Sequence, residues 1–381
     1  MVKRFSGPKA YPIIGNLNLF FGSIEDITNT LIKVSTNYPS PQRFWIGSQL
    51  TIMVDDPKHM RILLKSSYSY EKNQTYDFIK SELGDGLLTA PDSFLSCDLD
   101  LQNNPECKLD EYMSETMDII MKRTYLFWLH PDIIFYNSYL GKKLKELVSH
   151  IDKITSEGST TTAETLAFLF LMVATFPEVQ QQIYEELYQM YGSSDPEDIL
   201  ITLEDIKEMK YLERVIRETL RLFPPAAFIG RKISEDIEVD ENVTIPKNSS
   251  VLFSIFTYFR MEKYWKQPLT FNPDRFLQNN YNPKYFIPFS TGRRDCIGQT
   301  FAMDELKTIV ATVLRKFIVQ IDNPISIENI PIKVGLTLKP AASVFNSKTA
   351  ESDESVTSSS AKKLKCDIED VYMKIVVLNI K

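Results

Sequence analysis

The chain has 381 residues, of which 43% are hydrophobic and 24% charged, a composition typical of a folded protein with a large core. Its formal net charge of −7 gives no basic excess that would indicate a nucleic-acid partner. The four cysteines have neither zinc-finger spacing nor the density of a disulfide framework, which argues against both modules and favours a reducing compartment or a location facing the cytosol. No apolar run reaches the roughly 18 residues that a transmembrane helix needs.

Hydrophobic periodicity up to residue 223 predicts mostly helices. Pro8 and Pro12 favour an extended segment at the start, and the apolar residues between positions 44 and 54 predict a small hairpin. Asp55-Asp56-Pro57 predicts the start of a helix, whereas residues 84–110 are polar and irregular. Helical patterns are expected over residues 57–64, 110–127, 142–176, 179–191 and 211–223, with a short helix that starts at Leu203.

The second half of the chain adds a small β region. Strand patterns are expected over residues 228–256, 318–321 and 330–338, and a further helix over residues 299–315. Residues 347–363 are rich in Ser, Thr and charge, which predicts disorder, and residues 371–380 are apolar but too few to span a membrane. We therefore predict one mainly α domain with a small β region over residues 1–346 and an atypical, disordered tail over residues 347–381.

The loop at residues 289–298 carries the most specific chemical signal. Cys296 lies between Gly292 and Gly298, follows two arginines and precedes a predicted helix. A thiolate is stabilised by nearby positive charge and by the positive end of a helix, and it can then serve as an axial ligand of haem iron. The glycines allow turns and a close approach of the main chain to a flat cofactor. The ordinary alternative is a buried free cysteine in a glycine-rich turn.

The spacing of this loop resembles a known family. The pattern Phe-x-x-Gly-x-Arg-x-Cys-x-Gly, formed by Phe289, Gly292, Arg294, Cys296 and Gly298, is similar to the haem-binding loop of the cytochromes P450. The resemblance implies the mainly α cytochrome P450 fold, here incomplete, and haem b (iron protoporphyrin) as the cofactor. It makes Cys296 the metal ligand and the other four residues part of the cofactor-binding loop.

A second motif supports the resemblance. Glu218 and Arg221 are three residues apart and share one face of the predicted helix 211–223, where such pairs are usually exposed to solvent. The leucines around them and the prolines that follow make the segment similar to the family's ExxR motif. The resemblance implies that Arg275 joins the pair, because a rigid guanidinium can bind a carboxylate and backbone carbonyls together. The network would hold the loop that presents Cys296.

The segment from Glu157 to Thr162 contains a glycine and three threonines, which are poor residues for a helix interior. A threonine hydroxyl can bond to a preceding carbonyl and bend a helix; a helix end or turn explains the segment equally well. The segment resembles the oxygen-binding stretch of the family, which implies that Thr161 hydrogen-bonds oxygen and helps to deliver protons. Thr160 replaces the usual acidic residue. Glu157 is typical of the fatty-acid ω-hydroxylase (family 4-like) branch, where this carboxylate can be esterified to a haem methyl, so Thr161 and Glu157 are the catalytic candidates.

Some parts expected of a cytochrome P450 have counterparts in this sequence, and others do not. Arg231 matches a family arginine that binds a haem propionate, and Arg294 is a second candidate. The tryptophan-and-arginine helix that should follow residues 87–91 is missing, as are several helices that roof the substrate pocket, with a second gap near residues 140–148. Residues 6–16 resemble the hinge that follows an N-terminal anchor helix in eukaryotic members, and that anchor is absent.

The resemblance implies a haem-thiolate monooxygenase that inserts one oxygen atom from O2 into a C–H bond of a small apolar substrate such as a fatty acid. Its expected partner is the NADPH-dependent cytochrome P450 reductase, and its expected location is the cytosolic face of the endoplasmic reticulum membrane, with no role for nucleic acid. The alternative is a truncated, catalytically impaired haem-binding or non-functional isoform. The missing segments favour impaired catalysis.

Overall fold

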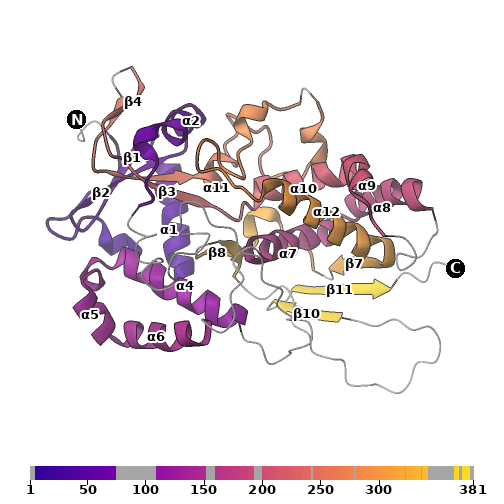
Figure 1. Ribbon diagram of the computed structural model, residues 1–381, viewed down its shortest axis with the longest axis horizontal. Helices are drawn as coiled ribbons and strands as arrows, with labels where there is room; N and C mark the ends of the chain where they lie inside the picture. The colour runs from indigo at the N-terminus through magenta and orange to yellow at the C-terminus, as the bar shows by residue number, and fades with distance from the viewer. Residues whose placement is uncertain are drawn as a thin grey trace.

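The computed structural model describes residues 5–73, 109–151, 159–192, 200–341 apart from 242, 279, 322 and 336, and then 364–368 and 371–377. Helices dominate this part of the chain, as the sequence predicts (Figure 1). The α-helices are α1 (Ile24–Asn37), α2 (Pro57–Lys65), α4 (Leu109–Tyr125), α5 (Asp132–Asn137), α6 (Tyr139–Ile151), α7 (Ser159–Thr175), α8 (Pro177–Tyr191), α9 (Leu203–Glu208), α10 (Lys210–Leu222), α11 (Ile255–Tyr258) and α12 (Gln299–Lys316). Short 3₁₀ helices are η2 (Leu17–Phe20), η3 (Ser67–Ser69), η5 (Phe127–Leu129), η6 (Pro273–Phe276), η7 (Pro283–Tyr285) and η8 (Ile327–Asn329).

The β region is small and divided among several sheets. The strands are β1 (Gln42–Ile46), β2 (Gln49–Val54), β3 (Phe228–Lys232), β4 (Ile237–Asp240), β5 (Val243–Ile245), β6 (Ser250–Ser254), β7 (Phe317–Ile321), β8 (Ile332–Val334), β9 (Leu338–Pro340), β10 (Leu364–Ile368) and β11 (Val371–Val377). The largest sheet has four strands in the order β1-β2-β6-β3. Its β2–β6 pair is parallel, so it joins the predicted N-terminal hairpin to the middle of the chain.

Helix starts follow local capping signals that the sequence already carries. The Asp56 carboxylate accepts hydrogen bonds from the backbone N–H groups of Lys58 and His59, and Pro57 occupies the first turn of α2. Ser23 and Asp26 form a reciprocal capping box at the start of α1. The predicted helix over residues 142–176 is seen as α6 and α7, which end and begin on either side of residues 152–158, outside the described part of the chain.

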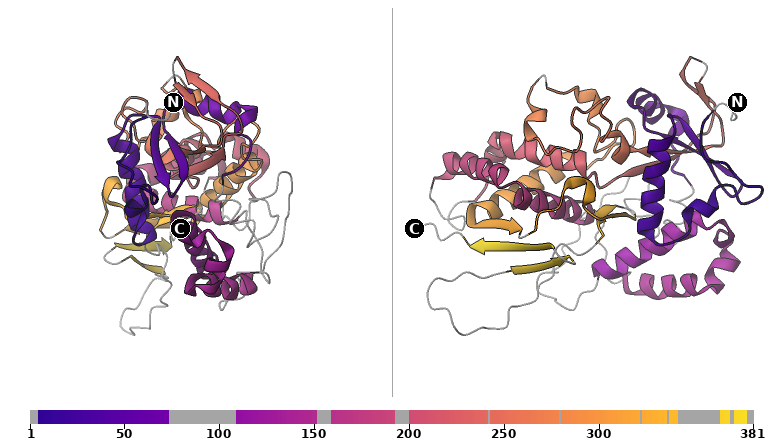
Figure 2. Two further views of the ribbon diagram at one scale, coloured as in Figure 1. Left: turned by 90° about the vertical axis from the view of Figure 1, so that its left-hand side faces the viewer. Right: turned by 180° about the vertical axis from the view of Figure 1, so that it is seen from behind.

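The main core lies where α7, α8, α10 and α12 pack together (Figure 1). α7 is apolar around most of its circumference because neighbours cover it, and its Phe168 stacks on Phe223 with ring centroids 4.3 Å apart. Helices α4, α5 and α6 form a separate layer with their own buried cluster (Figure 2). Among the described residues, no single helix is long and apolar enough to cross a membrane; only α7 and α8 taken together, bent by 105° at their junction, meet that test.

The last two strands, β10 and β11, lie within the segment for which the sequence predicts a tail. β10 pairs with β11, and β11 pairs antiparallel with β7, with Val377 opposite Phe317 and Met373 opposite Ile321. The expectation of a disordered tail over residues 347–381 stays a prediction. β-branched residues dominate β11, and the edge of β7 offers them backbone partners. The division at residue 346 stays a prediction.

Candidate functional site: a cysteine loop at the start of α12

The cysteine loop is held in its shape by its own backbone. The backbone N–H of Cys296 donates to the carbonyl oxygen of Phe289, 2.9 Å away, which closes the loop immediately before α12. Gly292 has φ +93°, and a Cβ atom there would lie 2.4 Å from the carbonyl oxygen of Leu64 at the end of α2. Only glycine fits this close approach without displacing backbone. The loop is thus fixed against α2 on one side and α12 on the other.

The sulfur of Cys296 faces outward. Cys296 is a free, exposed cysteine, and a Cβ atom at Gly298 would lie 3.9 Å from its Sγ atom. The large apolar side chains of Ile297 and Phe301 beside it are 76% and 71% exposed. Within the described residues, no side chain caps the N-terminus of α12, so its first N–H groups leave positive potential next to the sulfur. The arrangement presents a thiol, an apolar surface and a helix N-terminus together.

The predicted network of Glu218, Arg221 and Arg275 is confirmed. Glu218 and Arg221 are fully buried on α10, and Arg221 donates two hydrogen bonds to the two carboxylate oxygens of Glu218, at 2.7 and 2.8 Å. Arg275, on η6, reaches Glu218 Oε1 from its Nε at 3.3 Å. Burial lowers the pKa of Arg275, and the Glu218 carboxylate partly opposes that shift. The ordinary alternative, in which Glu218 and Arg221 form a solvent-exposed pair on the helix surface, is wrong.

This network also fixes the segment that leads to the cysteine loop. Arg221 Nη1 donates to the carbonyl oxygen of Phe259 at 2.8 Å, and Arg275 donates to the carbonyl oxygens of Lys266 and Gln267. At the far end of the same segment, the carbonyl oxygen of Tyr285 accepts a hydrogen bond from the hydroxyl of Tyr258. Tyr285 lies four residues before the cysteine loop begins. Charge-assisted hydrogen bonds to main-chain carbonyls hold the segment rigidly against α10.

Two threonines of α7 have different surroundings. Thr161 is exposed, and its carbonyl oxygen accepts a hydrogen bond from the hydroxyl of Thr165 at 2.8 Å. Thr162 is buried, and its hydroxyl donates to Glu305 Oε2 on α12 at 3.0 Å. Glu305 was not singled out from the sequence, because a lone acidic residue on a helix gives no sign of a partner on a distant helix. The bond ties the helix of Thr161 to the helix that follows Cys296.

The two candidate arginines also differ. Arg231 is buried in β3, and its Nη1 donates to the carbonyl oxygen of Gly230 at 2.9 Å. The guanidinium of Arg294 lies 4.1 Å from the ring centroid of Tyr70. Its Nε atom is buried and has no hydrogen-bond partner among the described residues, which leaves a donor ready for an acidic group. Glu157 lies outside the described residues, as does the segment where the tryptophan-and-arginine helix was expected.

Together these residues fit a haem. The exposed Sγ of Cys296 can ligate iron, Gly298 beside it leaves space for a flat macrocycle, and Ile297 and Phe301 offer apolar contact. The orphaned Nε of Arg294 can meet a propionate. Within the described residues, no group of three or more His, Cys, Asp or Glu side chains is placed to hold a metal ion.

Comparison with known proteins agrees with this geometry. The family model "Cytochrome P450" matches residues 141–345, and the chain therefore belongs to the cytochrome P450 family, whose members are haem-thiolate monooxygenases. The mainly α fold and the haem cofactor predicted from the sequence are thus confirmed at the level of the family.

The relatives that the chain matches are family 4 cytochromes P450, so the chain is a family 4-like cytochrome P450. It is 25% identical to cytochrome P450 4d2 of Drosophila melanogaster over 441 residues, covering 82% of this chain and 87% of that one. It is 31% identical over 248 residues to probable cytochrome P450 4p3 of the same organism (64% and 46% coverage) and 37% identical over 179 residues to cytochrome P450 4V2 of Mus musculus (46% and 33%). The chain thus spans less than half the length of the last two. The alignment with 4d2 is longer than the chain itself, so that relative contains segments with no counterpart here.

Proposed function

We propose that this chain binds haem b through Cys296 and acts as a monooxygenase on a small apolar substrate. The observation that carries the proposal is the exposed sulfur of Cys296 at the uncapped start of α12, beside Gly298, where a Cβ atom would meet only this sulfur within 4 Å. Bound haem supplies the activation of O2, so that one oxygen atom enters a C–H bond of the substrate and the other leaves as water.

The chain's own residues have separate tasks in this proposal. Cys296 provides the thiolate, and Arg294 and Arg231 bind the propionates. The exposed hydroxyl of Thr161 donates and accepts hydrogen bonds on the substrate side and passes protons inward. The bond between Thr162 and Glu305 keeps the helix of Thr161 in register with the helix behind Cys296. Glu157 is proposed as a covalent tether to a haem methyl.

The finer assignments rest on the family-4 relatives and on Glu157. A fatty acid is the proposed substrate class, because Glu157 is the residue typical of the fatty-acid ω-hydroxylase branch. The proposed electron donor is the NADPH-dependent cytochrome P450 reductase, and the proposed location is the cytosolic face of the endoplasmic reticulum membrane.

A second candidate function is haem binding with little or no turnover. The alignment with cytochrome P450 4d2 supports it, because that relative contains segments that this chain lacks. If the lost segments include the pocket roof and the reductase-docking surface, haem is held weakly and receives electrons slowly.

One reconstitution experiment separates the two. The protein is loaded with haem, mixed with NADPH, reductase and dodecanoic acid, and hydroxylated product is measured by mass spectrometry, with Cys296→Ser as the control. Product from the wild type and none from the variant supports the monooxygenase. Bound haem without product supports the impaired form, and failure of the wild type to bind haem contradicts both. Acid extraction of haem after turnover tests the Glu157 tether, which freely extractable haem would exclude.

A further inference from the structure

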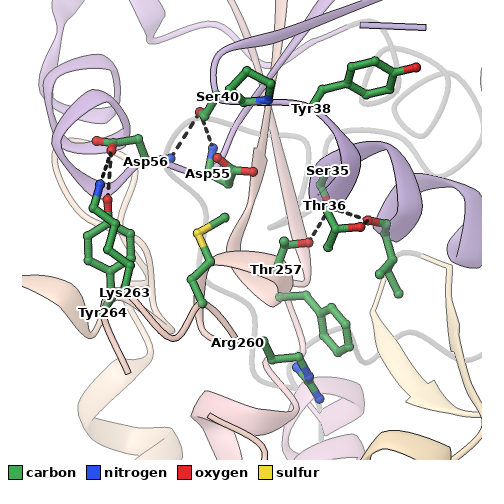
Figure 3. Close-up of a pocket in the computed structure, with 14 residues that line it drawn as sticks. Ser35, Thr36, Tyr38, Ser40, Asp55, Asp56, Thr257, Arg260, Lys263 and Tyr264 are labelled. Carbon is green, nitrogen blue, oxygen red and sulfur yellow. Dashed lines mark hydrogen bonds and ion pairs between the residues drawn. The ribbon is translucent and has the colours of Figure 1, made fainter. Parts of the chain in front are cut away.

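Several polar groups in a cleft of about 450 Å³ between α1, the start of α2 and α11 are bonded to neighbouring parts of the chain (Figure 3). The hydroxyl of Tyr264 donates to Asp56 at 2.9 Å, and Ser40 Oγ accepts from the backbone N–H of Asp56 at 3.3 Å. The hydroxyls of Ser35 and Thr257 lie 2.6 Å apart. These groups need no ligand, whereas the free edge of a β-sheet has open backbone donors and acceptors.

Strand β10 forms such an edge. It is the outer strand of the three-stranded sheet β10-β11-β7 (Figures 1 and 2). β11 pairs with it on one side, and within the part of the chain that the structure describes no strand pairs with its other side. A hairpin with a single neighbouring strand gains stability when a further strand joins the sheet. The free side of β10 is therefore a place where another extended segment can bind.

The hydrogen bonds of β7 show which way the backbone groups of β11 point. The backbone N–H of Val319 donates to Gln180 Oε1 at 2.7 Å, and Gln180 Nε2 donates to the carbonyl oxygen of Val319 at 2.8 Å. Both backbone groups of Val319 are thus used on the side of β7 that faces away from β11. Ile375 stands opposite Val319, and in such an antiparallel pair the backbone groups of both residues point away from each other. The N–H and C=O groups of Ile375 therefore face β10.

The same alternation identifies the backbone groups at the free edge of β10. Leu364 stands opposite Ile375, so its N–H and C=O groups face β11, and those of Cys366, two residues on, do the same. The residues between and after them point the other way. Lys365 and Asp367 therefore direct their N–H and C=O groups to the free edge.

The sequence around β10 is complementary to itself when two copies run antiparallel. Lysines occupy positions 362, 363 and 365 before Cys366, and acidic residues occupy positions 367, 369 and 370 after it. In an antiparallel pair of β10 strands centred on Cys366, Lys365 stands opposite Asp367 of the second copy. Leu364 then stands opposite Ile368 of the second copy. Opposite charges and apolar residues that face each other across strands are stabilising, whereas a parallel pair in register would set like charges against each other.

Lys365 has no acid opposite it in its own hairpin. The residue that stands opposite it on β11 is Lys374, and like charges directly opposite each other are destabilising. Pairing with a second copy would place Asp367 of that copy on the other side of Lys365. The charge pattern of β10 thus fits a partner strand better than it fits β11.

We propose that two copies of this chain associate by antiparallel pairing of their β10 strands about a twofold axis at Cys366. Lys365 and Asp367 of one copy then exchange backbone hydrogen bonds with Asp367 and Lys365 of the other, using the groups that are open at the edge. The two sheets join into one continuous sheet. Pairing through a strand of five residues forms a small interface, so the dimer is weak and reversible. The association is independent of haem and of the proposed monooxygenase activity.

Exchange of charges tests this register. Sedimentation velocity of the whole chain in reducing buffer, over a wide range of protein concentration, should show a reversible dimer. Lys365→Asp or Asp367→Lys alone sets like charges opposite each other at two symmetric places and should weaken the dimer about tenfold or more. The double exchange, Lys365→Asp with Asp367→Lys, restores opposite charges and should return the affinity to the wild-type value. Lys374→Asp is the matched control, because it changes the same charge on β11, away from the edge, and should leave the dimer unchanged.

Cys366 gives a second measure of the same register. Residues that face each other without mutual hydrogen bonds have Cα atoms about 4.5 Å apart, within the range of roughly 4.4–6.8 Å that a disulfide spans. A variant with Ser at Cys97, Cys107 and Cys296 keeps Cys366 as its one cysteine. Oxidised glutathione takes up the two electrons and two protons as two Cys366 thiols form a disulfide, and leaves as two reduced molecules. We expect a covalent dimer, with a much lower yield when Lys365→Asp is added.

Several outcomes would overturn the proposal. A wild-type chain that stays monomeric at every concentration would show that the edge of β10 takes no second copy. A dimer of equal affinity in Lys365→Asp, or one that the double exchange does not restore, would place the contact elsewhere. Lys365→Asp should melt no lower than the wild type, because it replaces a like-charged pair with Lys374 by an opposite-charged one, so loss of its dimer is not loss of folding.

Discussion

Removing Arg221 should destabilise the chain far more than removing a partly exposed arginine of the same helix. Arg221→Ala deletes both hydrogen bonds to Glu218 and the bond to the carbonyl oxygen of Phe259. It leaves the fully buried Glu218 carboxylate with the backbone N–H of Asn272 at 3.0 Å and the Arg275 Nε at 3.3 Å. Breaking a buried ion pair from one side costs about 3–5 kcal/mol, against a typical total stability of about 5–15 kcal/mol. The variant should therefore lose about a fifth or more of its free energy of unfolding.

Urea unfolding followed by circular dichroism measures this loss, and Arg217→Ala is the matched control. Arg217 lies on the same helix, is one-third exposed and pairs with Glu213, so its removal should cost at most about 1 kcal/mol. Adding Glu218→Gln to Arg221→Ala should cost less than the sum of the two single changes, because the first change already breaks the pair. Equal losses in Arg221→Ala and Arg217→Ala would refute the argument that the network is a buried structural unit.

Three further changes probe other parts of the molecule. Thr162→Val removes the hydrogen bond to Glu305 and should lower the free energy of unfolding by about 1 kcal/mol and speed haem loss to apomyoglobin, whereas Thr162→Ser should match the wild type. Burial raises the pKa of Asp55 from 3.8 to about 6, so the protonated form is favoured in the folded state and stability falls as pH rises through this range. Asp55→Asn should gain on the order of 2 kcal/mol over the wild type between pH 4 and 7 in urea titrations, and a pH-independent difference would contradict this. Gly292→Ala should destabilise more than Gly192→Ala in the same assay, because both have positive φ but only Gly292 has a backbone oxygen 2.4 Å from the new Cβ.

The sequence predicts the parts of this molecule that depend on short-range patterns. Pro57 and Pro177 mark helix starts, and the spacing of Glu218 and Arg221 places both side chains on one face of α10. The cysteine loop is recognisable because its turns need glycine at a fixed distance from Cys296, and the positive φ of Gly292 confirms that need.

The parts that sequence reasoning missed depend on contacts between distant segments. Glu305 acquires its hydrogen-bond partner, Thr162, only when α12 packs against α7. Nothing within the sequence of α12 identifies Thr162 as that partner. Arg260 looks like an ordinary charged residue after a short helix until the fold places its guanidinium 3.6 Å from the ring centroid of Phe256 and 5.5 Å from that of Phe223. The β11 strand could be read only as an apolar tail, because its backbone partner, β7, lies far away in the chain.

The absorption spectrum of the reduced, carbon monoxide-bound protein tests the central claim most directly. If Cys296 is the thiolate ligand of the haem iron, the wild-type protein loaded with haem shows the red-shifted Soret band of a thiolate-ligated complex, and Cys296→Ser loses that band. Survival of the band in Cys296→Ser would assign the ligand to another residue. Absence of the band from haem-loaded wild type would show that the exposed sulfur of this loop does not ligate iron.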